Sequence, residues 1–168
     1  MEFYLCQMES MKSLIRDVAD WPKPGVGFKD ITPLLASPHF PRVIDALEKL
    51  TVRPDFYVGI ESRGFLFASA LAQKTGAGLL LCRKKGKLPP PTVATSYSLE
   101  YGEDVLEMQP GNGTVVIVDD VFATGGTMRA ATELCAQAGY TVVDRLVLID
   151  LLFLHEEVEV KSLIQYAE

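Results

Sequence analysis

Residues 115–127 read Val-Val-Ile-Val-Asp-Asp-Val-Phe-Ala-Thr-Gly-Gly-Thr, and they are the most informative segment of the sequence. Its β-branched start predicts a buried strand, and the helical pattern from Thr127 onward predicts a helix directly after it. In open α/β sheets, ligands lie beyond the carboxyl ends of the strands. We therefore expect Asp119 and Asp120 at the mouth of a site, where their carboxylates accept hydrogen bonds from the two hydroxyls of a ribose.

The glycine-rich turn after the acidic pair is typical of a phosphate site. Its two glycines let the backbone approach an anion closely, its threonines offer hydroxyls, and the helix N-terminus presents free amides. A glycine pair before a helix is often only a tight turn, but the preceding strand and acidic pair favour phosphate. A 5′-phosphate is expected on Ala123, Thr124, Gly125, Gly126 and Thr127.

The rest of the chain alternates strands and helices around this segment. Strands are predicted at 56–60, 78–82, 114–118, 141–149 and 162–166, and helices at 11–18, 38–50, 63–74 and 127–138, with irregular chain between the first two helices. A β-hairpin is predicted around Gly102. The pattern indicates an α/β fold with a doubly wound, mostly parallel central sheet flanked by helices, in one domain.

The composition limits which binding partners and which cellular compartment are expected. The 168 residues are 48% hydrophobic and carry a net charge of -6, which favours a packed core and argues against nucleic acid as a partner. Cys6, Cys82 and Cys135 form no disulfide framework, so we expect free thiols in a reducing compartment. Neither a secretory signal nor a stretch long enough to span a membrane is evident. A cytoplasmic protein without membrane contact is predicted.

The strand, the acidic pair and residues 123–127 resemble the signature with which type I phosphoribosyltransferases bind 5-phosphoribosyl-1-pyrophosphate (PRPP). Four further segments resemble adenine-specific members of that family, in family order: PGVGFKDITP at 24–33, ESRGF at 61–65, RKKGKLP at 83–89 and SYSLEYG at 96–102. The resemblance implies that domain 1–168 has a hood, from about 20–36 plus the C-terminal segment, and a flexible β-hairpin flap at about 83–109. It also implies phosphoribosyl transfer from PRPP to N9 of adenine, giving AMP and pyrophosphate.

The resemblance also implies which residues bind the pyrophosphate leaving group. The family's pyrophosphate loop, which contains an unusual cis peptide, matches residues 61–64. The resemblance places pyrophosphate on Glu61, Ser62, Arg63, Arg83 and Lys87, with Arg83 reaching across the interface of a homodimer. By itself, the basic run at 83–87 is more often a solvated loop.

The resemblance also implies which residues bind adenine and which assist catalysis. Glu100 is expected to take the proton that the adenine imidazole ring loses, and Arg63 and Lys87 are expected to assist catalysis. Tyr101 would help to close the flap. Adenine is expected on Val26, Gly27, Phe28 and Lys29, mainly through backbone groups that favour a 6-amino purine.

The metal is expected to come with the substrate. Mg²⁺ would be held by PRPP rather than by a protein cage, and His39 and His155 are too separated to form a metal cluster, so both are expected at the surface.

The match departs from the family at Gly27, which could loosen the base pocket, at Pro90, which could stiffen the flap, and over residues 150–159, which match poorly. Two alternatives stay open: a phosphoribosyltransferase for another nucleobase, and a non-catalytic nucleotide-binding regulator with the same fold.

Overall fold

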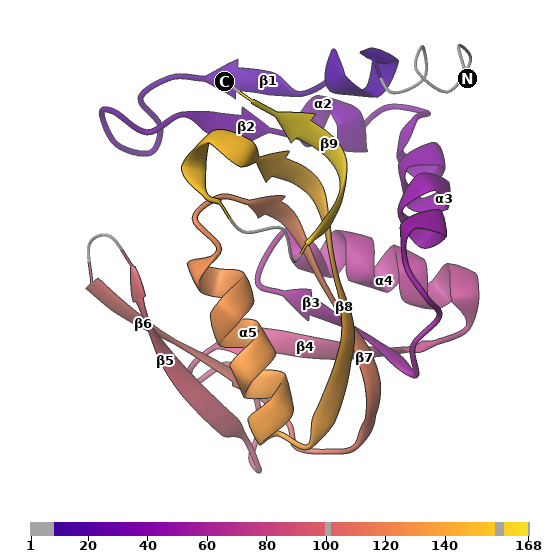
Figure 1. Cartoon of the computed structure of the whole chain (residues 1–168), viewed down its shortest axis with the longest axis vertical. Helices are drawn as coiled ribbons and strands as arrows, with labels where there is room; N and C mark the ends of the chain where they lie inside the picture. The colour runs from indigo at the N-terminus through magenta and orange to yellow at the C-terminus, as the bar shows by residue number, and fades with distance from the viewer. Residues whose placement is uncertain (1–8, 100–101, 157–159, 168) are drawn as a thin grey trace. The chain divides into compact units, whose positions relative to one another are not determined.

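The computed structural model describes residues 9–99, 102–156 and 160–167 (Figure 1). The chain forms two compact units, residues 1–46 and 47–168. The single domain expected over residues 1–168, with its hood and flap, stays a prediction. Within the described part of the chain, no helix is long and apolar enough to cross a membrane.

The first unit contains a two-stranded antiparallel sheet. β1 (Arg16–Val18) pairs with β2 (Phe28–Asp30), and α2 (Thr32–Leu35) and the start of α3 (Phe40–Leu50) follow. Arg16 Nε donates to Asp30 Oδ2 at 2.9 Å, and the Thr32 amide donates to Asp30 Oδ1 at 2.9 Å. Hydrogen bonds from Thr32 and then from Arg16 lower the pKa of Asp30 to about 2. This buried carboxylate therefore joins the sheet to the helix after it.

Two predictions for this unit are wrong in part. Residues 9–12 are helical, but the helix predicted over 11–18 gives way to β1. Met11 and Ile15 are buried, as their spacing suggested, whereas the backbone from Arg16 onward finds its hydrogen-bond partners in β2. The segment expected to be irregular through Pro33 contains β2 and α2, and Pro33 lies in the first turn of α2, where no amide is needed.

The second unit is built on a seven-stranded sheet with the order β5-β6-β4-β3-β7-β8-β9. The strands are β3 (Phe56–Ile60), β4 (Gly78–Lys84), β5 (Val93–Leu99), β6 (Gly102–Met108), β7 (Gly113–Phe122), β8 (Tyr140–Leu151) and β9 (Lys161–Tyr166). Pairing is parallel from β4 through β3, β7 and β8 to β9, and antiparallel from β4 to β6 to β5. The predicted mostly parallel sheet is confirmed.

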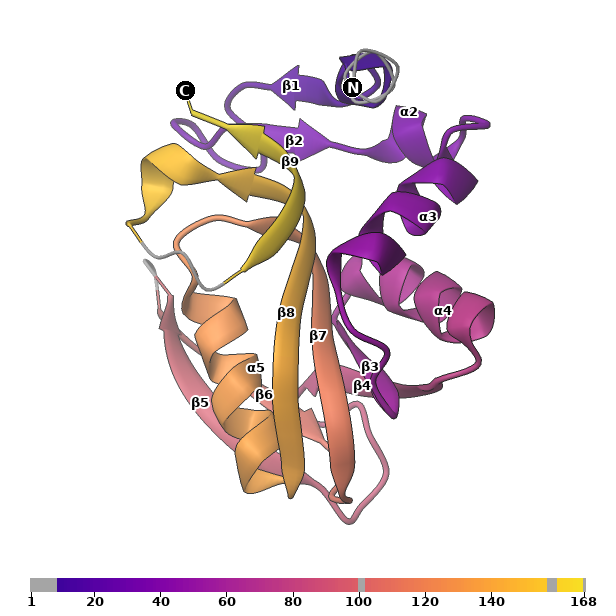
Figure 2. The same cartoon turned by 45° about the vertical axis from the view of Figure 1, so that its right-hand side comes forward.

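Two crossover helices cover this sheet. α4 (Gly64–Thr75) connects β3 to β4, and α5 (Gly126–Gln137) connects β7 to β8. Because the two crossovers lead away from each other along the sheet, right-handed connections put the helices on opposite faces, as Figure 2 shows. The strand order thus reverses between β3 and β7. In a doubly wound sheet, the loops after two such strands form the edge where ligands bind.

The core lies between this sheet and its helices. Residues 115–118 of β7 are fully buried, which agrees with their continuous apolar run. Cys82 and Cys135 are buried free thiols, and Cys6 lies outside the described residues. The predicted hairpin is confirmed in β5 and β6, and the Thr95 hydroxyl fixes β5 to α5 by donating to Gln137 Oε1 at 2.7 Å.

Candidate active site

A pocket opens at the start of α5. Gly125 precedes the helix with φ +81°, in the left-handed region that favours glycine, so the chain turns sharply into the first helical residues. The pocket is lined by Asp119, Val121, Phe122, Ala123, Thr124, Gly125, Gly126, Thr127 and Met128. The structure therefore brings all five predicted phosphate residues together around a helix N-terminus, where backbone amides suit an anion.

The acidic pair lies inside β7 rather than beyond its end. β7 continues to Phe122 because it keeps pairing with β8, so the expectation that the strand ends before Asp119 is wrong. Asp119 lines the pocket, and its Oδ1 accepts a hydrogen bond from the Asp120 amide at 2.8 Å. Burial and the neighbouring Asp120 charge raise the pKa of Asp119. Hydroxyl donors would relieve this desolvated carboxylate, which suits a ribose.

Arg63 connects the acidic pair to the loop after β3. Its Nε lies 2.8 Å from Asp120 Oδ2, and Asp120 is almost fully buried. Burial raises the pKa of Asp120, and the Arg63 charge opposes that effect. Gly64 makes the approach possible, because a Cβ there would lie 2.6 Å from the Val118 carbonyl oxygen. The peptide bond between Glu61 and Ser62 is cis, as the resemblance implies.

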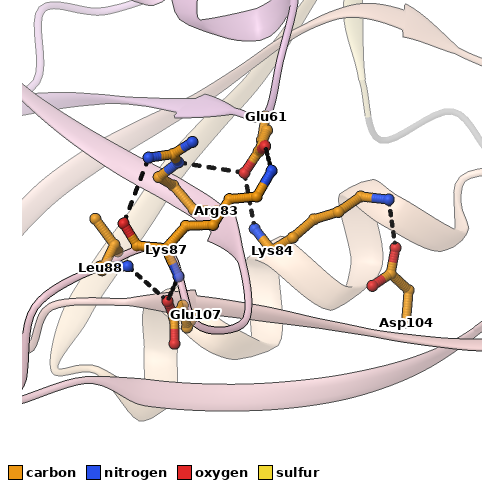
Figure 3. A network of polar contacts seen from close by, with 7 residues as sticks. All are labelled: Glu61, Arg83, Lys84, Lys87, Leu88, Asp104 and Glu107. Atoms are coloured by element: carbon orange, nitrogen blue, oxygen red, sulfur yellow. Dashed lines mark hydrogen bonds and ion pairs between the residues drawn. The ribbon is translucent and has the colours of Figure 1, made fainter.

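Glu61 is the centre of a cationic network at the end of β4 (Figure 3). Its Oε2 lies 3.2 Å from Arg83 Nε and accepts the Lys84 amide at 3.0 Å, while its Oε1 pairs with Lys87 Nζ. Burial raises the pKa of Glu61, but the hydrogen bonds from Lys87, Lys84 and Arg83 together outweigh it and lower that pKa to about 2. Glu61 thus stands among the predicted pyrophosphate residues as the partner of two cations.

Glu107 and Asp104 complete this network, and sequence reasoning missed both. Glu107 is buried, and its Oε1 accepts the amides of Lys87 and Leu88, each at 2.8 Å. Asp104 pairs with Lys84 at 2.8 Å. A signal for Glu107 existed, because a carboxylate between two apolar residues of a strand requires buried donors.

The predicted adenine segment lies in the first unit. Phe28 packs edge-on against Trp21, with ring centroids 4.4 Å apart, and Lys29 pairs with Asp17. The Val26 amide and carbonyl bond to the Lys23 carbonyl and the Trp21 amide. A Cβ on Gly27 would meet nothing within 4 Å, so that position is open. The backbone amide and carbonyl of Val26, which were predicted to bind the base, are therefore bonded inside their own loop.

Two predicted functional residues, Glu100 and Tyr101, lie outside the described residues. The surface position expected for His155 is wrong: its side chain is 5% exposed and bonds to Asp150. His39 is half-buried. Among the residues that the structure describes, no group of three or more His, Cys, Asp or Glu side chains could hold a metal ion.

Comparison with known proteins fits this geometry. Residues 34–159 match the sequence profile of the phosphoribosyl transferase domain. The chain belongs to the phosphoribosyltransferase family. The adenine phosphoribosyltransferase of Bdellovibrio bacteriovorus is 48% identical over 163 residues, which cover 93% of this chain and 99% of that protein.

Solved structures of the family agree with this assignment. The crystal structure of adenine phosphoribosyltransferase from Rhodothermus marinus matches with a TM-score of 0.86 and 43% identity, covering 96% of this chain and 99% of that one. The Saccharomyces cerevisiae enzyme, complexed with an iminoaltritol bisphosphate and adenine, matches with a TM-score of 0.85 and 34% identity over 95% and 99% of the two chains. The type I phosphoribosyltransferase fold expected from the sequence is confirmed.

Proposed function

We propose that this phosphoribosyltransferase transfers the 5-phosphoribosyl group of PRPP to N9 of adenine, giving AMP and pyrophosphate in purine salvage. The observation that carries the proposal is that a pocket at a helix N-terminus and a pair of cations lie at the carboxyl ends of β7 and β4, at the same edge of the sheet. The pocket before α5 suits a 5′-phosphate, and the Arg83 and Lys87 cations suit a pyrophosphate. The acidic pair and Arg63 belong to the same edge of the sheet. Adenine phosphoribosyltransferases that match nearly the whole chain support the choice of base.

In this proposal, each part of PRPP binds to its own group of residues. Free amides at the start of α5 and the threonine hydroxyls hold the 5′-phosphate, while Asp119 and Asp120 accept hydrogen bonds from the ribose hydroxyls. Their negative charge also stabilises positive charge that develops at C1′. As the bond from C1′ to the pyrophosphate oxygen breaks, Arg83 and Lys87 take up the charge of the leaving group.

The base provides the nucleophile. N9 of adenine forms the new bond to C1′, and the imidazole ring gives up one proton, which Glu100 accepts in this proposal. Tyr101 belongs to the same flap. Phe28 offers an aromatic face to the purine, and backbone groups of residues 26–29 read its 6-amino edge. Within this segment, Val26 already bonds its amide to the Lys23 carbonyl and its carbonyl to the Trp21 amide.

Magnesium enters as part of the substrate. A pyrophosphate binds Mg²⁺ through its own oxygens and water, so the protein needs few ligands of its own. The cation-rich surroundings of Glu61 fit this arrangement, because the Arg83 and Lys87 side chains suit phosphate oxygens rather than a bare metal ion.

A homodimer and a cytoplasmic location complete the proposal. An apolar groove runs along α4 and β4, where Leu66 and Leu79 are 45% and 41% exposed. This groove leads to Arg83, so a second copy seated there would adjoin the pyrophosphate cations. Leu66→Glu should shift the protein from dimer to monomer in analytical ultracentrifugation, and a wild-type monomer would refute the dimer. The two buried thiols suit the reducing cytoplasm.

The decisive experiment measures pyrophosphate release from PRPP and Mg²⁺ with adenine, hypoxanthine, guanine or no base, and identifies AMP by chromatography. Release with adenine alone supports the proposal. Preference for another base would retain the PRPP site and reject the role of residues 26–29. PRPP binding without release for any base would favour the non-catalytic regulator.

A further inference from the structure

The pocket before α5 has an aromatic wall. Phe122, the last residue of β7, is 5% exposed, and its Cζ lies only 2.9 Å from where a Cβ on Gly125 would stand. The ring therefore packs directly against the residue that sets the turn into α5. The position of this ring decides where the Gly125 backbone, and the amides that follow it, can lie.

The Phe122 ring also contacts His155. The two rings are edge-on, with centroids 4.6 Å apart and an interplanar angle of 88°. His155 follows the short 3-10 helix η1 (Leu152–Leu154), and its side chain is 5% exposed. Its Nδ1 is buried and has no hydrogen-bond partner among the residues that the structure describes. The imidazole is thus held by its Nε2 side and by ring packing.

Asp150 fixes the imidazole. His155 Nε2 lies 2.7 Å from Asp150 Oδ1, and the Asp150 side chain is 4% exposed. Because a carboxylate only accepts, Nε2 carries the hydrogen. Asp150 is also the register partner of Phe122 across β7 and β8. Asp150, His155 and Phe122 therefore form a closed unit that we call the brace, and it ends at Gly125.

We propose that Asp150 and His155 are positioning residues for the 5′-phosphate site, which act by holding Phe122 behind Gly125. Nothing in the acidic pair or the Glu61 network requires a buried histidine at this point. The threonine side chains of this site can adjust to a shifted turn, but its backbone amides cannot, so the amide part of the site needs support from behind. The brace supplies that support from a segment about 30 residues further along the chain.

The inference rests on the proposed function, and calorimetry with two ligands tests it. Ribose 5-phosphate probes the pocket before α5, and inorganic pyrophosphate probes the Arg83 and Lys87 cations. His155→Leu removes the donor to Asp150 and should weaken ribose 5-phosphate binding about tenfold while leaving pyrophosphate binding within about twofold. His155→Gln retains a planar donor and should recover most of the loss.

Two more variants distinguish a positioning role from a general loss of stability. Phe122→Leu keeps the pair of Asp150 and His155 but removes the ring behind Gly125, so it should reproduce the selective loss. Thr51→Val removes a 2.9 Å hydrogen bond to Asp144 elsewhere on β8 and should lower the unfolding temperature without changing either affinity. In steady-state assays, His155→Leu should raise KM for PRPP about tenfold and change kcat by about twofold at most.

The outcomes separate the two proposals. The brace would be overturned if His155→Leu lost affinity for both ligands equally. It would also be overturned if His155→Leu kept wild-type affinity for both and only its unfolding temperature fell. Failure of the wild-type protein to bind ribose 5-phosphate and to form AMP would overturn the proposed function together with it. If the wild-type protein binds ribose 5-phosphate and the variants bind it with the same affinity, only the brace is rejected.

Discussion

The two anion sites that we propose for this protein are built in different ways. The nine described residues that line the pocket before α5 include no cation, so backbone amides and threonine hydroxyls supply its donors. Around Glu61 the donors are side-chain cations, Arg83 and Lys87, already paired with a carboxylate. A fixed set of amides suits a phosphate that stays bound through the reaction. Cations with an internal counter-ion suit a leaving group that must be exchanged.

The largest effect should come from removing the acidic pair, in which Asp119 lines the pocket before α5 and Asp120 pairs with Arg63. Asp119→Ala combined with Asp120→Ala deletes the acceptors for the ribose hydroxyls, and turnover should fall at least about a thousandfold. The fold should persist, because burial raises the pKa of both carboxyl groups and neither is required as a core charge. Initial rates and circular dichroism measure the two properties. Near-normal turnover would remove these residues from the site.

The next effect should come from a single added methyl group. Gly125→Ala places a Cβ 2.9 Å from Phe122 in a residue with φ +81°, so it should raise KM for PRPP about a hundredfold. Gly76→Ala is the matched control, since Gly76 has φ +74° at the end of α4 and its nearest neighbour would lie 3.4 Å away. Both should lose stability, and only the first should lose PRPP affinity. Similar KM values in the two variants would show that a preformed backbone turn does not matter.

These expectations depend on features that the sequence already shows. Residues 115–127 carry the strand, the acidic pair and the turn within one continuous segment, so local patterns sufficed to locate the pocket. The strand predicted at 56–60 has the same bounds in the structure. Both results come from short-range rules, namely burial of β-branched runs and the glycine requirement of a tight turn.

Features built from distant residues could not be predicted in this way. β1 is only three residues long and exists because it pairs with β2, which overrides the helical spacing of Met11 and Ile15. The histidine of the brace was expected at the surface, because no pattern in residues 150–156 reveals that its partner is a buried aspartate. The role of Glu61 as a counter-ion depends on strands β3 and β4 lying side by side.

A smaller effect, opposite in sign, should follow from removing that counter-ion. Glu61→Gln leaves Arg83 and Lys87 without the charge that occupies them, so pyrophosphate should bind about fivefold more tightly, as measured by calorimetry. Asp104→Asn removes one negative charge from the same network, but from Lys84, and should have less effect. Weaker pyrophosphate binding in Glu61→Gln would mean that Glu61 orients the two cations and does not compete with the ligand.

The smallest effect concerns the pH dependence of stability. The pKa of Glu61 is lowered from 4.5 to about 2, so its ion pairs stabilise the folded protein fully above pH 4.5 and lose that contribution as the pH falls towards 2. The difference in urea midpoint between wild type and Glu61→Gln should therefore be constant above about pH 5 and shrink below pH 4.5. Asp30 titrates in the same range in both proteins, so its contribution cancels in the difference. A difference that stays constant down to pH 3 would show that Glu61 stabilises the network by packing and neutral hydrogen bonds, and the contrast between an exchangeable cationic site and a fixed amide site would then lose its electrostatic basis.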